Sequence, residues 1–272
     1  MVRAPYTCSQ KSGKEDNSMA KAILSNLRQA LINRGFLVSL IGVVLVIFLS
    51  SVQDMLTAFR SEELLANGFH DMLIASALKA DGMTLALPIL AALPFTTCFV
   101  DDMKSGYVKE YLPRTTRKRY LWGKSIACAV SGGLVLAVGI LAAYIISALL
   151  FSPMEAALAK GAQAPAYFGE LMGKVLLFFC SGAFWSIVGL AFATLTNSKY
   201  MAYASPFVIY YVLIILYERY FNKLYVLYPK EWTNPSDAWM WGNLGVSLLM
   251  LELTIIFGML FAAAAKRRLD QI

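Results

Sequence analysis

The sequence predicts an all-α integral membrane protein with six transmembrane helices. Hydrophobic residues make up 58% of the 272 residues, and the mean hydropathy is +0.60. Charged residues make up 15%, whereas soluble domains carry about 25%. Six apolar stretches approach or exceed the roughly 20 residues that a membrane-crossing helix needs. These three observations exclude an ordinary soluble domain.

The N-terminal region predicts two segments. Residues 1–17 are polar and predict a disordered tail. In residues 18–34, apolar side chains such as Leu27 and Leu31 recur at helical spacing, and polar side chains such as Arg28 fill the other side. This pattern predicts an amphipathic helix in the cytoplasmic interface of the membrane.

Residues 35–272 form the predicted six-helix transmembrane domain. The expected spans are 36–52, 84–100, 121–151, 171–195, 201–217 and 244–265. The second contains Pro88 and Pro94, which a membrane helix tolerates where neighbouring helices satisfy the freed carbonyl groups. The third contains the pair Gly132 and Gly133, which allows close contact with another helix.

The loop between the second and third spans, residues 101–122, concentrates positive charge. The basic residues of the loop and of the entrance to the third span are Lys104, Lys109, Arg114, Arg117, Lys118, Arg119 and Lys124. The positive-inside rule places such a loop, and with it both termini, on the cytoplasmic side. The net charge of +7 is explained by this distribution, so we predict no nucleic-acid partner.

Two features near the C-terminus depart from a plain set of spans. Residues 218–243 are unusually aromatic, which predicts a segment that lies in the outer interface or dips into the membrane as a re-entrant piece. A plain aromatic belt around two helix ends is the alternative. Glu252 is the only acid in the middle of an apolar span and is expected to face protein or water.

The chain shows no pattern of catalytic or metal-binding residues. His70 is the only histidine, and the sequence places neither a nucleophile nor a metal-ligand set around it. The four cysteines, Cys8, Cys98, Cys128 and Cys180, have no metal or disulfide spacing. Because the phosphate-binding loop of ATPases is also missing, we predict that the chain is not an enzyme and holds no metal or cofactor itself.

The central loop carries a recognisable order of residues. Asp102 and Gly106 are followed by Tyr107, then Thr116, Arg117, Tyr120 and, at the start of the third span, Lys124. This order resembles the cytoplasmic loop of type-2 ATP-binding-cassette (ABC) exporter permeases. The loop differs in its proline, since Pro113 stands one position earlier than the family often has it. The predicted spans and interfacial helix extend the resemblance over most of the chain from about residue 19.

The resemblance implies a type-2 ABC exporter permease fold and a membrane subunit without its own ATPase domain. Two copies, identical or similar, would form the translocation path, and each would dock on a separate ATPase subunit that binds ATP and Mg. The loop at 101–122 would be the coupling helix. The implied coupling interface comprises Asp101, Asp102, Lys104, Gly106, Tyr107, Tyr111, Arg114, Arg117, Arg119, Tyr120 and Lys124. We also expect Asp101 and Asp102 to pair with Arg117 or Lys124.

By the same resemblance, the second and fifth spans would line the path. The candidate lining residues are Thr96, Thr97, Tyr203, Tyr210, Tyr211, Tyr217 and Glu252, although helix packing is the alternative for each. An apolar path with scattered hydroxyl groups suits an amphipathic cargo such as a peptide, a lipid or a drug. The expected location is the plasma membrane of a bacterium, in contact with its lipids. Three alternatives stay open: an ion-coupled carrier or channel that uses Glu252, a lipid-modifying membrane enzyme, and a permease-like sensor that does not transport.

Overall fold

The computed structural model describes residues 9–61, 64–156, 167–221 and 223–271. The side chains of residues 9–19, 111, 114, 167 and 168 also lie outside this description, as does the part of the predicted tail at residues 1–8. Within the described ranges, every element of regular secondary structure is a helix. The one β-like feature there is an isolated bridge between Leu65 and Glu155.

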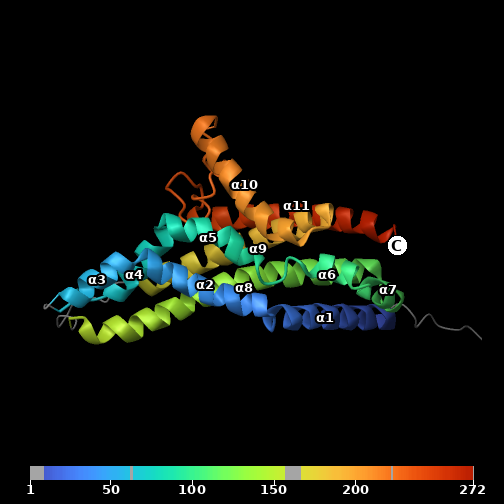
Figure 1. The fold of residues 1–272 in the computed structure, drawn as a ribbon, viewed down its shortest axis with the longest axis horizontal. Helices are drawn as coiled ribbons and strands as arrows, with labels where there is room; N and C mark the ends of the chain where they lie inside the picture. Colours follow the sequence, from blue (N-terminus) through green and yellow to red (C-terminus); the bar gives the residue numbers. More distant parts are fainter. Residues whose placement is uncertain (1–8, 62–63, 157–166, 222, 272) are drawn as a thin grey trace, which may run out of the picture.

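The helices form an elongated bundle (Figure 1). The α-helices are α1 Ser9–Leu31, α2 Arg34–Ser50, α3 Val52–Arg60, α4 Phe69–Lys79, α5 Asp81–Ala92, α6 Cys98–Lys104, α7 Tyr107–Tyr111, α8 Arg117–Phe151, α9 Tyr167–Thr196, α10 Lys199–Arg219 and α11 Gly242–Leu269. Short 3-10 turns occur at Leu112–Arg114, Ser152–Met154 and Tyr225–Leu227. Helix α10 projects from the bundle, while α1, α6, α7 and the C-terminus lie at one end.

Four helices, α8 to α11, are long and apolar enough to cross a membrane. The number rises to six if each of two bent pairs counts as one span. These pairs are α1 with α2, bent by 57°, and α4 with α5, bent by 70°. The described residues therefore agree with the prediction of an all-α membrane protein.

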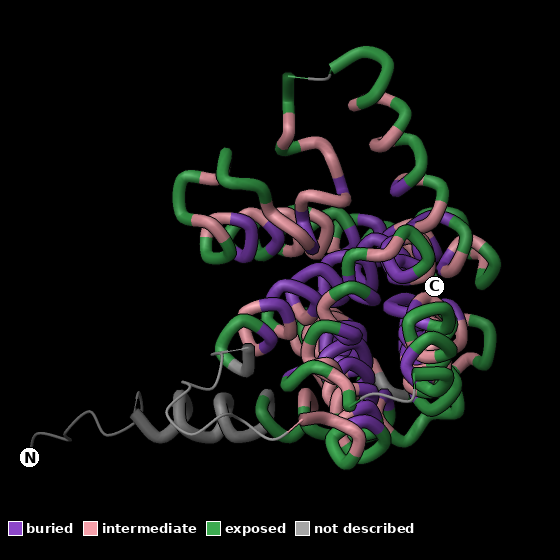
Figure 2. The backbone as a smooth tube through the Cα atoms, turned by 90° about the vertical axis from the view of Figure 1, so that its left-hand side faces the viewer, coloured by how far each residue is buried: buried purple, intermediate pink, exposed green. Residues whose placement is uncertain are grey.

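Helix α9 forms the centre of the bundle, and every residue from Ser181 to Leu190 is buried. It packs against α8, α10 and α11, and Figure 2 shows this buried centre beside the projecting α10, which is less buried. At the crossing of α8 and α9, a Cβ added at Gly132 would lie 2.8 Å from the carbonyl oxygen of Gly182 and 2.4 Å from Cβ of Ser186. The space between the two helices is too small for any side chain at position 132, so the predicted close contact at Gly132 is confirmed.

The predicted second span is not one continuous helix. Helix α5 ends at Ala92 and α6 begins only at Cys98. Pro94 lies in the gap, and a proline lacks an N–H donor and clashes with the carbonyl four residues earlier. The helix in the expected span 84–100 is therefore interrupted at residues 93–97.

Helix α2 satisfies the carbonyl groups that this break frees. The Ser39 hydroxyl donates a hydrogen bond of 2.5 Å to the carbonyl of Leu90, and the Asn33 side-chain amide donates one of 2.9 Å to the carbonyl of Pro94. Unpaired carbonyl groups would be costly in an apolar interior. Neighbouring side chains thus make the proline break tolerable, as the sequence predicts.

Two boundaries also differ from expectation. Helix α1 begins at Ser9, well before the predicted start at residue 18, and α2 begins at Arg34. The sequence analysis missed α3 and α4. Helix α4 carries Leu73, Ile74, Ala77 and Leu78 on one buried face, a helical spacing that is visible in the sequence.

The aromatic segment 218–243 folds back onto the bundle. Trp232 is buried, and its ring centroid lies 5.6 Å from that of Phe184 and 5.9 Å from that of Trp185, both on α9. Lys230 forms an ion pair of 2.7 Å with Asp81 at the start of α5. The segment therefore closes over the junction of α4, α5 and α9.

Candidate functional site

The loop between α6 and α8 is a compact turn with one short helix. Gly106 has a φ of 78°, a conformation that favours glycine, and it separates α6 from α7. Val108 is only 1% exposed and anchors α7 on the bundle. The surface that stays exposed includes Lys104 and Lys109. The apolar side of α7 is therefore used within the chain, and its polar side faces outward.

An ion pair connects this loop to α8. The Nζ atom of Lys124 lies 2.9 Å from the Oδ2 atom of Asp102, and the Lys124 side chain is 3% exposed. The hydroxyl group of Tyr120 donates a hydrogen bond of 2.6 Å to the same oxygen. The Lys124 ammonium group also lies 5.0 Å from the ring centroid of Phe95, within cation–π range. The pair is thus held in a mostly buried and specific geometry.

A second carboxylate connects the loop to α10. Asp101 forms an ion pair with Lys199, the first residue of α10, and accepts a hydrogen bond of 2.8 Å from the Thr97 hydroxyl. Lys199 and Asp101 are partly exposed, so solvent weakens the attraction between them. The contact nevertheless joins α6 to α10 directly.

A third ion pair connects the start of α8 to the end of α11. Arg117 bonds Asp270, which follows α11 in the sequence. Both side chains are about half exposed. Arg268 donates a hydrogen bond of 2.8 Å to the carbonyl of Leu195 near the end of α9. The ends of α8, α9 and α11 therefore meet at the loop.

Two adjoining pockets lie between α1 and the loop. The larger has a volume of about 550 Å³ and is lined by residues that include Gln29, Thr97 and Asp101. The smaller has about 310 Å³ and is bordered by Asn26, Gln29 and Lys124. We call the loop, its three ion pairs and these pockets the loop-end cluster. Within the described residues no group of three His, Cys, Asp or Glu side chains could hold a metal ion.

The expected pairing of the loop is correct in one part and wrong in another. Asp102 pairs with Lys124, as expected. Arg117 pairs with Asp270 instead of either loop carboxylate, because α11 ends beside the start of α8. Among the other predicted interface residues, Tyr107 is half exposed, Arg119 is partly buried, and the side chains of Tyr111 and Arg114 lie outside the described part.

The candidate path residues do not share one location. Thr96 is buried in the break between α5 and α6, and its hydroxyl group donates a hydrogen bond to the carbonyl of Ala92. Tyr210 is buried against Trp185, with ring centroids 5.7 Å apart, whereas Tyr211 is 39% exposed. Of the remaining candidates, Tyr203 is partly buried and Thr97 lines the larger pocket. Tyr217 stacks on Tyr228, with ring centroids 4.3 Å apart, and Glu252 is exposed on α11. A single copy of the chain therefore does not bring these side chains together.

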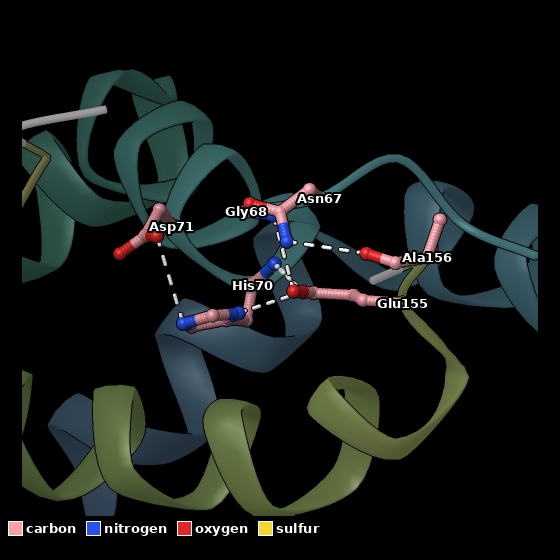
Figure 3. A network of polar contacts seen from close by, with 6 residues as sticks. All are labelled: Asn67, Gly68, His70, Asp71, Glu155 and Ala156. Carbon is pink, nitrogen blue, oxygen red and sulfur yellow. Dashed lines mark hydrogen bonds and ion pairs between the residues drawn. The ribbon is translucent and has the colours of Figure 1, made fainter. Parts of the chain in front are cut away.

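A second polar network lies where α4 meets the end of α8 (Figure 3). The carboxylate of Glu155 accepts hydrogen bonds of 3.0 Å from the backbone N–H groups of Gly68 and His70, and its Oε1 atom lies 2.6 Å from Nδ1 of His70. Nε2 of His70 lies 3.6 Å from Asp71. Burial alone would raise the pKa of Glu155, but the hydrogen bonds from His70 and Gly68 outweigh it and lower that pKa. Glu155 thus caps the N-terminus of α4.

Sequence reasoning missed Lys199, Asp270 and Glu155 as partners. Each pairs with a residue far away in the chain: Asp101, Arg117 and His70, respectively. Spacing rules reach only neighbours within one element, so they cannot find such pairs. The one visible signal was a charged residue at the very start or end of an apolar helix.

Compared with known proteins, the chain matches no protein-family model and no curated protein. Any proposed function therefore depends on the geometry of the described residues and on the residue order of the loop.

Proposed function

We propose that the chain is the membrane-spanning permease subunit of an ATP-driven exporter. In this proposal it crosses the membrane six times, both termini are cytoplasmic, and α1 lies in the cytoplasmic interface. The loop at 101–122 docks on a separate ABC ATPase subunit. A second permease protomer completes the translocation path for an amphipathic cargo, and the partner ATPase supplies ATP and Mg. The sequence resemblance of the loop motivates this proposal.

The observation that supports it most is the connectivity of the loop-end cluster. One exposed loop is tied by ion pairs to α8 and α10, and the helix that follows it is tied to α11. A force applied to α7 would therefore reach three of the four long apolar helices at once. Alternating access requires such a contact between the energy source and the moving helices.

The exposed surface of the loop has suitable chemistry for a protein partner. Lys104 and Lys109 present positive charge beside the half-exposed Tyr107 and the exposed Glu110. Arg117 lies at the start of α8, where it pairs with Asp270. Arginine and tyrosine are enriched at protein interfaces, and charge steers association. A carboxylate-rich cleft on the ATPase would complement this surface.

Photo-crosslinking tests the proposal. Lys109 is replaced by p-benzoylphenylalanine, the protein is produced in its native membranes, and the crosslinked products are identified by mass spectrometry. We expect an ABC ATPase subunit as the crosslinked partner, and none when the probe replaces Arg60 on α3. A probe at position 109 that crosslinks no ATPase, in membranes where the chain is intact, contradicts the proposal.

An ion-coupled carrier that uses Glu252 remains the alternative function. Glu252 is exposed on α11 in the middle of an apolar helix, a costly position for a charge in lipid. The decisive experiment is cargo transport in vesicles. Transport driven by a proton gradient without ATP, and abolished by Glu252→Gln, favours the carrier; transport that needs ATP and survives Glu252→Gln favours the exporter. ATP hydrolysis by the complex with an ATPase subunit, without transport of cargo, would indicate the permease-like sensor.

A further inference from the structure

A long apolar groove runs between α8 and α11 on the outside of the bundle. Its volume is about 550 Å³, within the usual range of ligand pockets. Small residues open it: Ala129 on α8, and Gly258 and Ala262 on α11. A Cβ added at Gly258 would meet no other atom within 4 Å, which confirms that this side of α11 is open. Ile187 of α9 is buried and forms part of the lining.

The groove has the length of one membrane leaflet. Its lining runs along α8 from Lys118 to Ala129 and along α11 from Thr254 to Lys266. At about 1.5 Å per residue these stretches span roughly 16 and 18 Å, a little more than half of a 30 Å hydrocarbon core. One acyl chain of a lipid matches this length and shape.

One end of the groove is positively charged. Lys118 and Lys266 both line it, and the Arg117–Asp270 ion pair shows that these two helix ends lie together. Asp270 stands one turn after Lys266, but Arg117 already engages it. Within the described part of the chain, neither Lys118 nor Lys266 forms an ion pair with a carboxylate.

The position of Trp122 indicates where a lipid head group would lie. Trp122 stands one turn after Lys118 on the same face of α8, lines the groove and is 55% exposed. Indole rings favour the level of lipid head groups. The two ammonium groups and this indole therefore mark a head-group site, with the apolar groove extending from it.

We propose that the groove between α8 and α11 binds an anionic phospholipid. Lys118 and Lys266 would hold its phosphate group, and one acyl chain would lie along Ala129 and Gly258. Basic pockets between membrane helices commonly hold anionic head groups. The inference requires only that the chain lies in a membrane and does not depend on export.

A second copy of the chain is a poorer occupant. A two-fold interface brings the same patch of both copies together. Such an interface centred on the charged end would place two Lys118 and two Lys266 side chains near one another, and like charges destabilise an interface. A phosphate group instead complements this charge.

Quenching of Trp122 fluorescence by brominated lipids tests the proposal. The full chain is reconstituted in vesicles of phosphatidylcholine that contain either dibrominated phosphatidylglycerol or dibrominated phosphatidylcholine. The contribution of Trp122 is the difference between the wild type and Trp122→Phe. Each basic residue near the membrane surface strengthens anionic lipid binding about fivefold, so we expect the relative association constant to favour phosphatidylglycerol about 30-fold.

Two variants and two matched controls separate the parts of the site. Lys118→Gln/Lys266→Gln should abolish the preference, and Gly258→Leu should weaken quenching by both lipids because it fills the groove. Lys21→Gln/Arg28→Gln, which removes equal charge from exposed positions on α1, and Gly169→Leu, at another open glycine, should change neither. Equal quenching by both lipids in the wild type overturns the proposal even if a variant fails to fold. A preference that survives loss of both lysines, or no quenching of Trp122 by either lipid, also overturns it.

Discussion

At the scale of single residues, the Lys124–Asp102 pair is the most constrained contact of the loop-end cluster. The ammonium group has one carboxylate at 2.9 Å and one aromatic ring at 5.0 Å. A buried pair adds little stability compared with apolar residues, but removal of one partner leaves an uncompensated charge. The pair is therefore better explained as a device that fixes α6 on α8 than as a source of stability.

This explanation predicts a non-additive pair of substitutions. Lys124→Met should destabilise the protein by about 3 kcal/mol, a decrease of roughly 6–10 °C in Tm, because Asp102 loses its counter-charge. Asp102→Leu/Lys124→Met should recover most of that loss. Thermal unfolding in detergent measures both, with Lys109→Met at an exposed position as the control. If the double variant is as unstable as the sum of the single ones, the pair has a different role.

The Arg117–Asp270 pair separates an internal role from a partner interface. Arg117→Asp removes the ion pair, and Arg117→Asp/Asp270→Arg restores it with the charges exchanged. If Arg117 contacts the ATPase, the exchanged double variant regains the free energy of unfolding but not the ATPase coupling. Binding of each variant to the ATPase subunit identified by crosslinking distinguishes an internal role of Arg117 from a role in the partner interface. Recovery of coupling in the double variant would assign Arg117 to the internal contact alone.

At the scale of elements, the break between α5 and α6 shows how a proline is accommodated. The break is paired to α2 by the Ser39 and Asn33 side chains. The break covers the five residues 93–97, and α6, which carries Asp101 and Asp102, begins directly after it at Cys98. The geometry of the break therefore sets the direction in which α6 presents Asp101 and Asp102.

Removing one of these hydrogen bonds should have a measurable cost. Ser39→Ala leaves the Leu90 carbonyl unpaired in the interior and should cost about 1–3 kcal/mol of stability. Ser205→Ala is the matched control, because Ser205 is also buried but bonds the carbonyl of Met201 in its own helix. Chemical denaturation compares the two. Equal costs for both variants would show that the Leu90 carbonyl finds another partner.

The cap of α4 by Glu155 predicts a dependence on pH. The pKa of Glu155 is lowered in the folded protein, so its stabilising effect is present above the ordinary pKa of about 4.3 and is lost as the pH falls through the lower folded value. Near pH 7, Glu155→Gln should reduce protection of the amides of Gly68 and His70 about 30-fold, which corresponds to about 2 kcal/mol for charge-assisted hydrogen bonds. Asp71 and Tyr144 also face His70 and are kept unchanged.

Hydrogen exchange, corrected for the intrinsic rates at each pH, measures this effect. The wild type and Glu155→Gln should differ near neutral pH and converge in acid, below the lowered pKa of Glu155. A difference that persists unchanged at acidic pH would show that ionisation of Glu155 does not hold α4.

At the scale of the whole molecule, the sequence predicted the long helices well. Five of the six predicted spans correspond to α2, α8, α9, α10 and α11, because apolar length alone determines them. The break in the helix of the second expected span was not located, because Pro94 acts through local sterics that a hydropathy window averages out. Helices α3 and α4 were missed because each is too short to give the apolar length by which a span is recognised.

The loop-end cluster was predictable only in part. The sequence indicated its residues and the Asp102–Lys124 pair. Lys199 and Asp270 were not found, because their roles depend on which helix ends meet in space. The same limit applies to the candidate path residues: Tyr210 and Tyr211 are adjacent in sequence, yet one is buried and the other exposed.

The central claim is that the loop at 101–122 lies on the cytoplasmic face, opposite the end that carries α3. Labelling of Lys109→Cys and Arg60→Cys with a membrane-impermeant maleimide tests it most directly, in a Cys8→Ser background where Cys98, Cys128 and Cys180 are buried. The claim predicts that Lys109→Cys reacts only in inside-out vesicles and Arg60→Cys only in right-side-out vesicles. Reaction of Lys109→Cys in right-side-out vesicles, or of both positions from the same side, would contradict it.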